Sequence, residues 1–164
     1  MNVTQIAAEL SELGAQALLT KETLARLAYT GADDSPRVIP VGFWWDGTEI
    51  VICTMVGSPK VRAISERPDV ALTIDASDTP ATAKSVLMRG RASVDIVDGV
   101  AEEYLAAAAK SMSGEELAQF EQNVRALYDQ MARITIEPTW TKFYDFGAGR
   151  LPKSLADLVQ SAAG

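Results

Sequence analysis

The segment from Thr54 to Arg62 has the residue types and spacing most suited to binding an anion. A strand-like run ends at Thr54, a loop with Gly57 follows, and Ser58-Pro59 begins a short helix with Lys60 and Arg62 in its first turn. Backbone N–H groups at a helix N-terminus are free to bind an anion. Two cations there are unfavourable for the helix itself, because cations belong at its other end. A bound phosphate would relieve this conflict, unless Ser58 only caps the helix and both cations point to water.

The rest of the chain offers few reactive side chains. Its 164 residues include no histidine and one cysteine, Cys53. These counts exclude a Ser-His-Asp triad, a Cys-His pair, a histidine-ligated zinc ion and an internal disulfide. Cys53 alternates with Ile52 in an apolar run, so an inert, buried thiol is expected. The protein therefore either binds ligands without reacting or depends on a cofactor for its chemistry.

Length and composition are those of one globular domain, expected to span residues 1–164. The apolar content is 48%, which is ordinary for such a domain. No run approaches the roughly 18 apolar residues of a membrane span. The first 20 residues lack a basic region and include Glu9 and Glu12, so no signal peptide is expected. We expect a cytoplasmic protein that does not contact membranes.

Charge is unevenly distributed along the chain. The net charge of −7 and the pI of about 4.6 argue against nucleic-acid binding, which requires a basic face. Residues 1–36 sum to −3 and residues 92–164 to −5, whereas residues 37–91 hold seven basic and six acidic side chains, net +1. An anionic ligand would bind the central segment at the lowest electrostatic cost, although ordinary variation of surface charge explains the counts equally well.

The elements that must position residues 54–62 are mainly strands. Pro40 cannot donate to a strand ladder, so its strand is expected at a sheet edge or facing a ligand. Asp46-Gly47 is a hairpin turn. Phe43 and Trp45 are expected to fill the core rather than stack on a flat ring. Strands are predicted at residues 23–30, 37–45, 49–54, 70–75, 86–97, 133–137 and 139–146, the last two divided by Pro138.

Helices are predicted at fewer places. One covers residues 4–14 and ends at Gly14, with Ile6, Leu10 and Leu13 on its buried face. Others are expected at residues 58–67, from an Asp98 cap to about residue 110, and after the Ser113 capping box to about residue 131. Six or seven strands without a repeating βαβ unit indicate an α+β protein that is mainly β, a small barrel with helical decoration.

The order of several motifs resembles that of a known family. The strand RVIPV, the turn WDGT, the strand EIVICT, the loop and helix GSPKVRAI, and the strands VALTID and VLMRGRA follow one another. Together they resemble the pyridoxamine 5′-phosphate oxidase-like proteins, which are split β-barrels that bind FMN or the deazaflavin coenzyme F420. The resemblance covers residues 20–97 and continues more loosely through PTWTKFYDF and GRLP. The helical insert at 98–132 belongs to only some members.

The resemblance implies a cofactor site, residue by residue. Lys60 matches the lysine that holds the cofactor phosphate, and Ser58 and Thr54 match its hydroxyl partners. Arg62 corresponds to a second basic residue near the phosphate or the acidic tail of the coenzyme. Many relatives have Asn-Leu where this chain has Ala63-Ile64. The strand whose backbone faces the isoalloxazine ring corresponds to Val38, Ile39, Pro40 and Val41.

The resemblance also implies an assembly and an activity. The family's cofactor lies at a dimer interface, so a homodimer is expected, with Arg89, Arg91, Trp140 or Lys142 approaching the partner's site. The implied function is that of an FMN- or F420-dependent oxidoreductase acting on a small substrate, with no metal. A non-catalytic protein that binds flavin, haem or another small ligand on the same barrel is the alternative, because fold alone does not determine function.

The missing histidines separate this chain from authentic pyridoxamine phosphate oxidases. Those enzymes recognise their substrate with a C-terminal Arg and His beside a Trp-Arg segment. The corresponding stretch here is Thr139-Trp140-Thr141-Lys142, and the chain has no histidine at all. The resemblance therefore implies a different substrate from that of the vitamin B6 oxidases.

Overall fold

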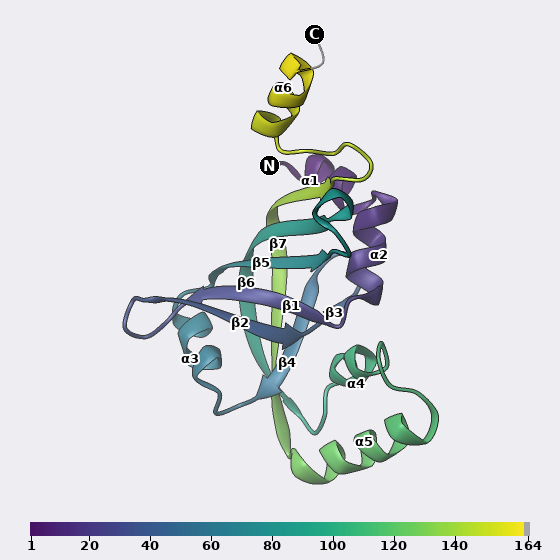
Figure 1. Cartoon of the computed structure of the whole chain (residues 1–164). Coiled ribbons are helices and arrows are strands. Elements are labelled where there is room, and N and C mark those ends of the chain that lie inside the picture. Colours follow the sequence, from purple (N-terminus) through teal and green to yellow (C-terminus); the bar gives the residue numbers. More distant parts are fainter. Residues whose placement is uncertain (163–164) are drawn as a thin grey trace.

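The computed structural model describes residues 1–162. Its frame is a seven-stranded antiparallel sheet with the strand order β2-β1-β5-β6-β7-β4-β3 (Figure 1). The sheet curls so that β2 and β4 contact each other, although no ladder joins them. The strands are β1 (Leu24–Thr30), β2 (Pro36–Gly42), β3 (Trp44–Trp45), β4 (Ile50–Met55), β5 (Asp69–Ala76), β6 (Lys84–Asp98) and β7 (Gln130–Asp145).

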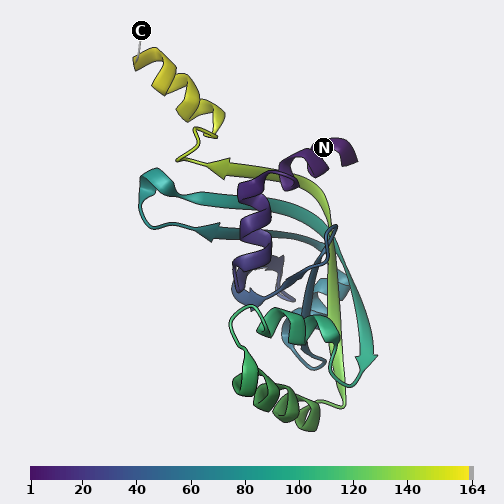
Figure 2. The same ribbon diagram turned by 90° about the vertical axis from the view of Figure 1, so that its right-hand side faces the viewer.

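Residues 1–162 include six α-helices. Figure 2 shows α1 and α2 against one side of the curled sheet, and α4 and α5 as a helical hairpin near its other end, while α6 stands away from the body. None of the described helices is long and apolar enough to cross a membrane. The helices are α1 (Val3–Leu10), α2 (Leu13–Lys21), α3 (Pro59–Glu66), α4 (Glu102–Ala108), α5 (Gly114–Leu127) and α6 (Lys153–Ala162), and a 3-10 turn covers Pro80–Thr82.

Alternating apolar side chains of the strands form the core. In β6, the side chains of Val86 and Met88 are buried in the core. Arg89, the next residue along the strand, is exposed on the opposite face of the sheet. Phe43 and Trp45 are buried in the same core, as the sequence predicts. The predicted hairpin at Asp46-Gly47 is confirmed, because β3 and β4 pair on either side of it.

The N-terminal helical region differs from the prediction at Gly14. Helix α1 ends at Leu10, and Gly14 is the second residue of α2 rather than the residue that ends the first helix. A Cβ atom at Gly14 would lie 2.4 Å from Cζ of Phe143, so glycine allows α2 to approach that ring closely. Leu13 is 89% exposed and does not belong to the buried face.

Pro138 does not divide two strands, contrary to the prediction, because a bulge accommodates it within β7. Gly90 pairs with Pro138 and Arg89 pairs with Trp140, which leaves Thr139 as an extra residue between them. A bulge releases the ladder bond that proline cannot donate. The result is one strand of 16 residues that pairs with β6 along nearly its whole length.

One predicted helix cap is wrong, and a second lacks its predicted hydrogen bond. Asp98 remains in β6, where its carboxylate accepts a hydrogen bond from Gln130 at 3.1 Å, and Ala101 occupies the N-cap of α4. Ser113 does occupy the N-cap of α5, but its side chain makes no capping hydrogen bond. The β6–β7 ladder continues to the pair of Asp98 and Gln130. The N-cap of α4 therefore lies three residues later in the chain than predicted.

A charged cluster attaches α1 to β7. The Glu9 carboxylate accepts hydrogen bonds from Lys142 Nζ at 2.6 Å, from the Phe143 N–H at 3.0 Å and from Arg150 Nη2 at 2.8 Å. Burial alone would raise the pKa of Glu9, but these hydrogen bonds and the two nearby positive charges outweigh it and hold the pKa below its ordinary value of 4.5.

We predict that Glu9→Gln lowers the free energy of unfolding by about 1–3 kcal/mol at pH 7, because charged hydrogen bonds to a largely buried carboxylate are lost. A carboxyl group with a lowered native pKa stabilises the fold above its unfolded pKa and loses that effect as pH falls through the native pKa. The difference between Glu9→Gln and the original chain should therefore shrink below about pH 4. Urea unfolding at several pH values measures it. Glu12 is the control, because its side chain is 44% exposed and, within residues 1–162, accepts a hydrogen bond only from Arg150 Nη1, at 2.8 Å. A Glu12→Gln effect as large as that of Glu9→Gln would contradict the prediction.

Candidate functional site

The turn between β4 and α3 brings Ser58 and Lys60 together. The Ser58 N–H donates to the Met55 carbonyl at 3.1 Å, and the Ser58 carbonyl accepts from the Val61 N–H at 2.9 Å, so the turn leads directly into the helix. Ser58 is only 7% exposed, and its hydroxyl accepts a hydrogen bond from Lys60 Nζ at 2.8 Å. The Ser58 side chain makes no capping hydrogen bond. Ser58 thus occupies the N-cap position of α3, but its hydroxyl binds Lys60 instead of a backbone N–H group of the helix.

Lys60 holds a half-buried positive charge without a counterion. Burial lowers the pKa of its ammonium, and within residues 1–162 no carboxylate offsets that cost. A Cβ atom at Gly57 would have no atom within 4 Å, so the turn leaves open space beside Ser58. An unpaired ammonium, a buried hydroxyl and a helix N-terminus beside open space fit a phosphate group.

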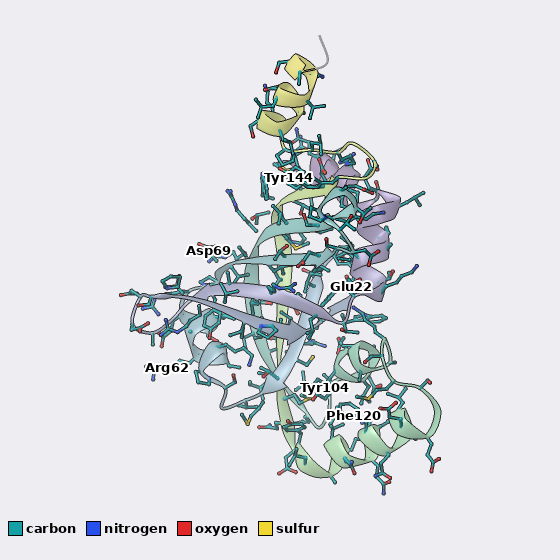
Figure 3. The ribbon with its side chains drawn as sticks, viewed as in Figure 1. Glu22, Arg62, Asp69, Tyr104, Phe120 and Tyr144 are labelled. Atoms are coloured by element: carbon teal, nitrogen blue, oxygen red, sulfur yellow. The ribbon has the colours of Figure 1, made fainter. Side chains whose placement is uncertain are left out.

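Arg62 lies apart from this pair. Its side chain is 83% exposed, its Nε donates to Glu66 at 2.9 Å, and it points outward from α3 (Figure 3). Residues two positions apart on a helix do not face each other, which places Arg62 and Lys60 on different sides of α3. Of the three residues predicted to form one group, the fold brings Ser58 and Lys60 together, and Arg62 lies apart from them.

Thr54 lies near the end of β4, opposite Ala132 of β7, and is half-buried. By strand alternation it shares the inward face with Ile50 and Ile52, and Cys53 lies on the other face. Thr54 therefore leads into the turn from the core side of β4.

Strand β2 presents the second group of predicted site residues at an open sheet edge. It pairs only with β1, so the predicted edge position of Pro40 is confirmed. Val38, which is 67% exposed, and Pro40 face outward, whereas Ile39 is half-buried and Val41 is buried in the core. The unpaired edge leaves backbone groups of this strand accessible to a ligand.

Two hollows adjoin β4 on its outer side. One, of about 380 Å³, lies between β2, β4 and the helical insert, and Gly42 and Cys53 line it. The other, of about 500 Å³, lies between the turn before α3 and the end of α5, and includes Gly57 and Tyr128. The contribution of the insert cannot be predicted from the sequence, because its aromatic residues recur at ordinary helical spacing and carry no sign of a ligand.

The residues expected to approach a partner subunit have different environments. Arg89 lies over the ring of Trp140, with its guanidinium carbon 4.7 Å from the ring centroid, on the outer surface of β6 and β7. Arg91 is exposed on the same strand. Lys142 is engaged by Glu9 within its own chain.

Comparison with known proteins identifies the family. The family model described as pyridoxamine 5′-phosphate oxidase matches residues 14–143. The chain belongs to this family. The matched range includes β1 to β6, all but the last two residues of β7, and the turn between β4 and α3, so both groups of predicted site residues lie within it.

Solved structures support the same fold. An F420 reductase is 27% identical, with a TM-score of 0.59 over 77% of this chain and 94% of its own. A FAD-binding protein from Mesorhizobium loti is 18% identical (TM-score 0.54, 82% and 92% covered), and the haem storage protein HutZ from Vibrio cholerae is 17% identical (TM-score 0.57, 82% and 93% covered). The open, curled sheet is thus the split barrel that the sequence predicts. A search of curated proteins finds no match.

Proposed function

We propose that this protein is an oxidoreductase that uses FMN, or alternatively F420, and that the coenzyme phosphate binds at Ser58 and Lys60. The observation that carries the proposal is the half-buried ammonium of Lys60, which is held by a buried hydroxyl and has no counterion in residues 1–162. A phosphate offsets this desolvated charge, and the N-terminus of α3 adds to the attraction. The similar F420 reductase supports a coenzyme of the flavin type.

The remaining predicted residues have supporting roles in this proposal. The backbone of Val38–Val41 lies along the flat ring at the open edge of β2, and Thr54 supplies a further hydroxyl. Arg62 attracts the acidic part of the coenzyme from its exposed position on α3. The coenzyme, when bound, supplies hydride transfer, and the chain itself binds, orients and shields it from water.

We also propose that two chains assemble around the coenzyme. Val38 and the edge of β2 are accessible in a single chain, and a flat ring placed there would be open to water on one side. A second chain would cover that side, and Arg89 with Trp140 provides an exposed surface for contact.

Haem binding has less support from the residues. The chain contains no histidine, and burial raises the pKa of the Cys53 thiol to about 12, so the thiolate that could serve as an axial ligand is disfavoured. A protein that only stores a flavin would use the same phosphate site, so turnover must separate storage from catalysis.

Coenzyme titration tests the proposal. Purified protein is titrated with FMN and with F420, and binding is followed by coenzyme fluorescence, while light scattering gives the oligomeric state. We expect saturable binding of one of the two coenzymes to a dimer, and oxidation of the reduced coenzyme by at least one small acceptor. Failure of both to bind would refute the proposal, and binding without turnover would leave a storage protein.

A further inference from the structure

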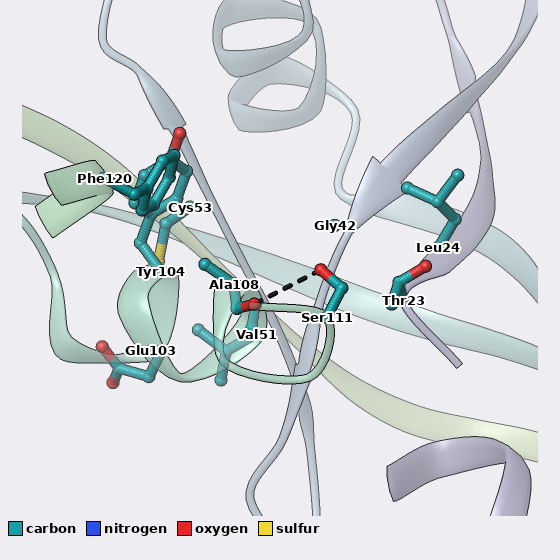
Figure 4. A pocket seen from close by; sticks show the side chains of 11 residues that line it. Thr23, Leu24, Gly42, Val51, Cys53, Glu103, Tyr104, Ala108, Ser111 and Phe120 are labelled. Atoms are coloured by element: carbon teal, nitrogen blue, oxygen red, sulfur yellow. Dashed lines mark hydrogen bonds between the residues drawn. The ribbon is translucent and has the colours of Figure 1, made fainter. Parts of the chain in front are cut away.

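The cavity of about 380 Å³ beside β4 is built by segments distant in the sequence. Gly42 comes from the end of β2, Val51 and Cys53 from the outer face of β4, and Tyr104 and Phe120 from the helical insert (Figure 4). Its size falls within the range of about 300–1,000 Å³ typical of small-molecule sites. It is distinct from the turn that holds Ser58 and Lys60, neither of which lines it.

The walls of the cavity are mostly apolar and include two aromatic rings. The rings of Tyr104 and Phe120 stack with their centroids 5.9 Å apart and an interplanar angle of 27°. Figure 4 shows this pair beside Cys53 at one end, and Thr23, Leu24 and Ser111 at the other. Burial, and to a smaller extent the charge of Glu103, raise the pKa of the Cys53 thiol to about 12, so this group is neutral near pH 7.

Two of the polar side chains that line the cavity, those of Glu103 and Ser111, have hydrogen-bond partners within the chain. Glu103, the only charged residue among the described residues that line it, accepts a hydrogen bond from Arg133 Nη1 at 3.2 Å. The Ser111 hydroxyl donates to the Ala108 carbonyl at 3.3 Å. The Arg133 guanidinium beside Glu103 is already paired with that carboxylate, so a ligand that carries a negative charge would meet no unpaired cation among the described lining residues and would lose its hydration without compensation. The lining therefore favours an uncharged ligand.

Lys110, just after the end of α4, joins the insert to α2. Lys110 Nζ donates to the carbonyls of Leu19 at 3.3 Å and Glu22 at 3.0 Å, at the C-terminal end of α2, and lies 3.6 Å from the ring centroid of Phe43. Cations at a helix C-terminus are favourable. This contact ties the insert to the barrel and directs the Lys110 charge toward α2.

We infer that this cavity binds an uncharged, apolar molecule that contains an aromatic or similarly flat ring. We infer further that this molecule is the substrate that exchanges a hydride with the coenzyme. The assignment as substrate rests on the proposed function, because Gly42 directly follows the strand segment Val38–Val41 along which the ring of the coenzyme would lie. The preference for an uncharged ring rests only on the residues that line the cavity. Offset stacking against Tyr104 and Phe120 would orient it.

Two related dyes test the inference. N-phenyl-1-naphthylamine is uncharged, and 8-anilinonaphthalene-1-sulfonate adds a negative charge to the same ring system. We expect the uncharged dye to bind the coenzyme-free protein at least tenfold more tightly than the sulfonate. Ala108→Leu should fill the cavity and weaken binding of the uncharged dye at least tenfold, whereas Ala109→Leu, at the next and exposed position, should change it less than twofold. Circular dichroism establishes that both variants fold.

Equal binding of the two dyes, or equal behaviour of the two leucine variants, would overturn the inference. The coenzyme titration is run on the same proteins, so the two proposals fail separately. If the dye results are as expected but neither coenzyme binds, the cavity stands as a ligand site and the proposed function falls. If a coenzyme binds but Ala108→Leu does not raise the KM for any acceptor that is turned over, the cavity is not the substrate site.

Discussion

Replacing Lys60 by alanine should weaken coenzyme binding about ten- to hundredfold. A hydrogen bond between an ammonium and a phosphate contributes about 1.5–3 kcal/mol, and about 1.4 kcal/mol corresponds to a factor of ten in affinity. The ammonium of Lys60 is half-buried, already oriented by Ser58 and without a competing carboxylate in residues 1–162, so little of this energy is spent on reorganisation. Fluorescence titration of FMN and F420 measures the effect.

Arg62→Ala is the matched comparison on the same helix. The Arg62 guanidinium is exposed and already pairs with Glu66, so its attraction for a coenzyme is weakened by solvent and by that carboxylate. We expect the affinity to fall by less than about threefold, and the loss to disappear at high salt, because solvent-exposed charges are screened. Equal losses for Lys60→Ala and Arg62→Ala would show that the phosphate is not held at Ser58, even if a coenzyme binds.

Gly90→Ala should destabilise the fold by about 1–3 kcal/mol. A Cβ atom at this position would lie 2.5 Å from Cγ2 of Ile136 and 2.7 Å from the carbonyl oxygen of Glu137. The isoleucine side chain is fully buried and the carbonyl belongs to the backbone of β7, so neither can move without disturbing the bulge around Pro138. Overpacking of this kind costs about 1–3 kcal/mol. Urea unfolding measures the loss.

Gly147→Ala serves as the control for this substitution. Its Cβ atom would come no closer than 3.5 Å to any neighbour, and the residue does not have a positive φ. We expect its stability to differ from the original chain by less than about 0.5 kcal/mol. Equal stability of Gly90→Ala and the original chain would mean that β6 and β7 are less closely packed at the bulge than the structure indicates.

Local patterns in the sequence determine most of the strands and one half of the candidate site. Alternation of apolar residues predicts β1, β4 and β5 to within two residues, and the chemistry of Asp46-Gly47 predicts the hairpin between β3 and β4. Ser58-Pro59 predicts the start of α3, and Pro40 predicts an edge strand. Each of these depends on the preferences of adjacent residues, which the sequence displays directly.

Only the tertiary structure decides features that depend on the approach of distant segments. Gly14 would end a helix by local preference, but the ring of Phe143 makes it a contact position inside α2. Pro138 would end a strand, but Gly90 of β6 allows a bulge that keeps β7 continuous.

The candidate sites divide in the same way. The sequence places Lys60 and Arg62 two residues apart, and only the helix geometry with the Ser58 and Glu66 contacts shows that they face different surroundings. The cavity behind Tyr104 and Phe120 forms where the insert packs on β4. The sequence by itself thus determines the residues of the candidate phosphate site, because they are neighbours in the chain. The tertiary structure alone decides which of their charges stay unpaired and where a second ligand can fit, because burial and pairing depend on residues far apart in the sequence.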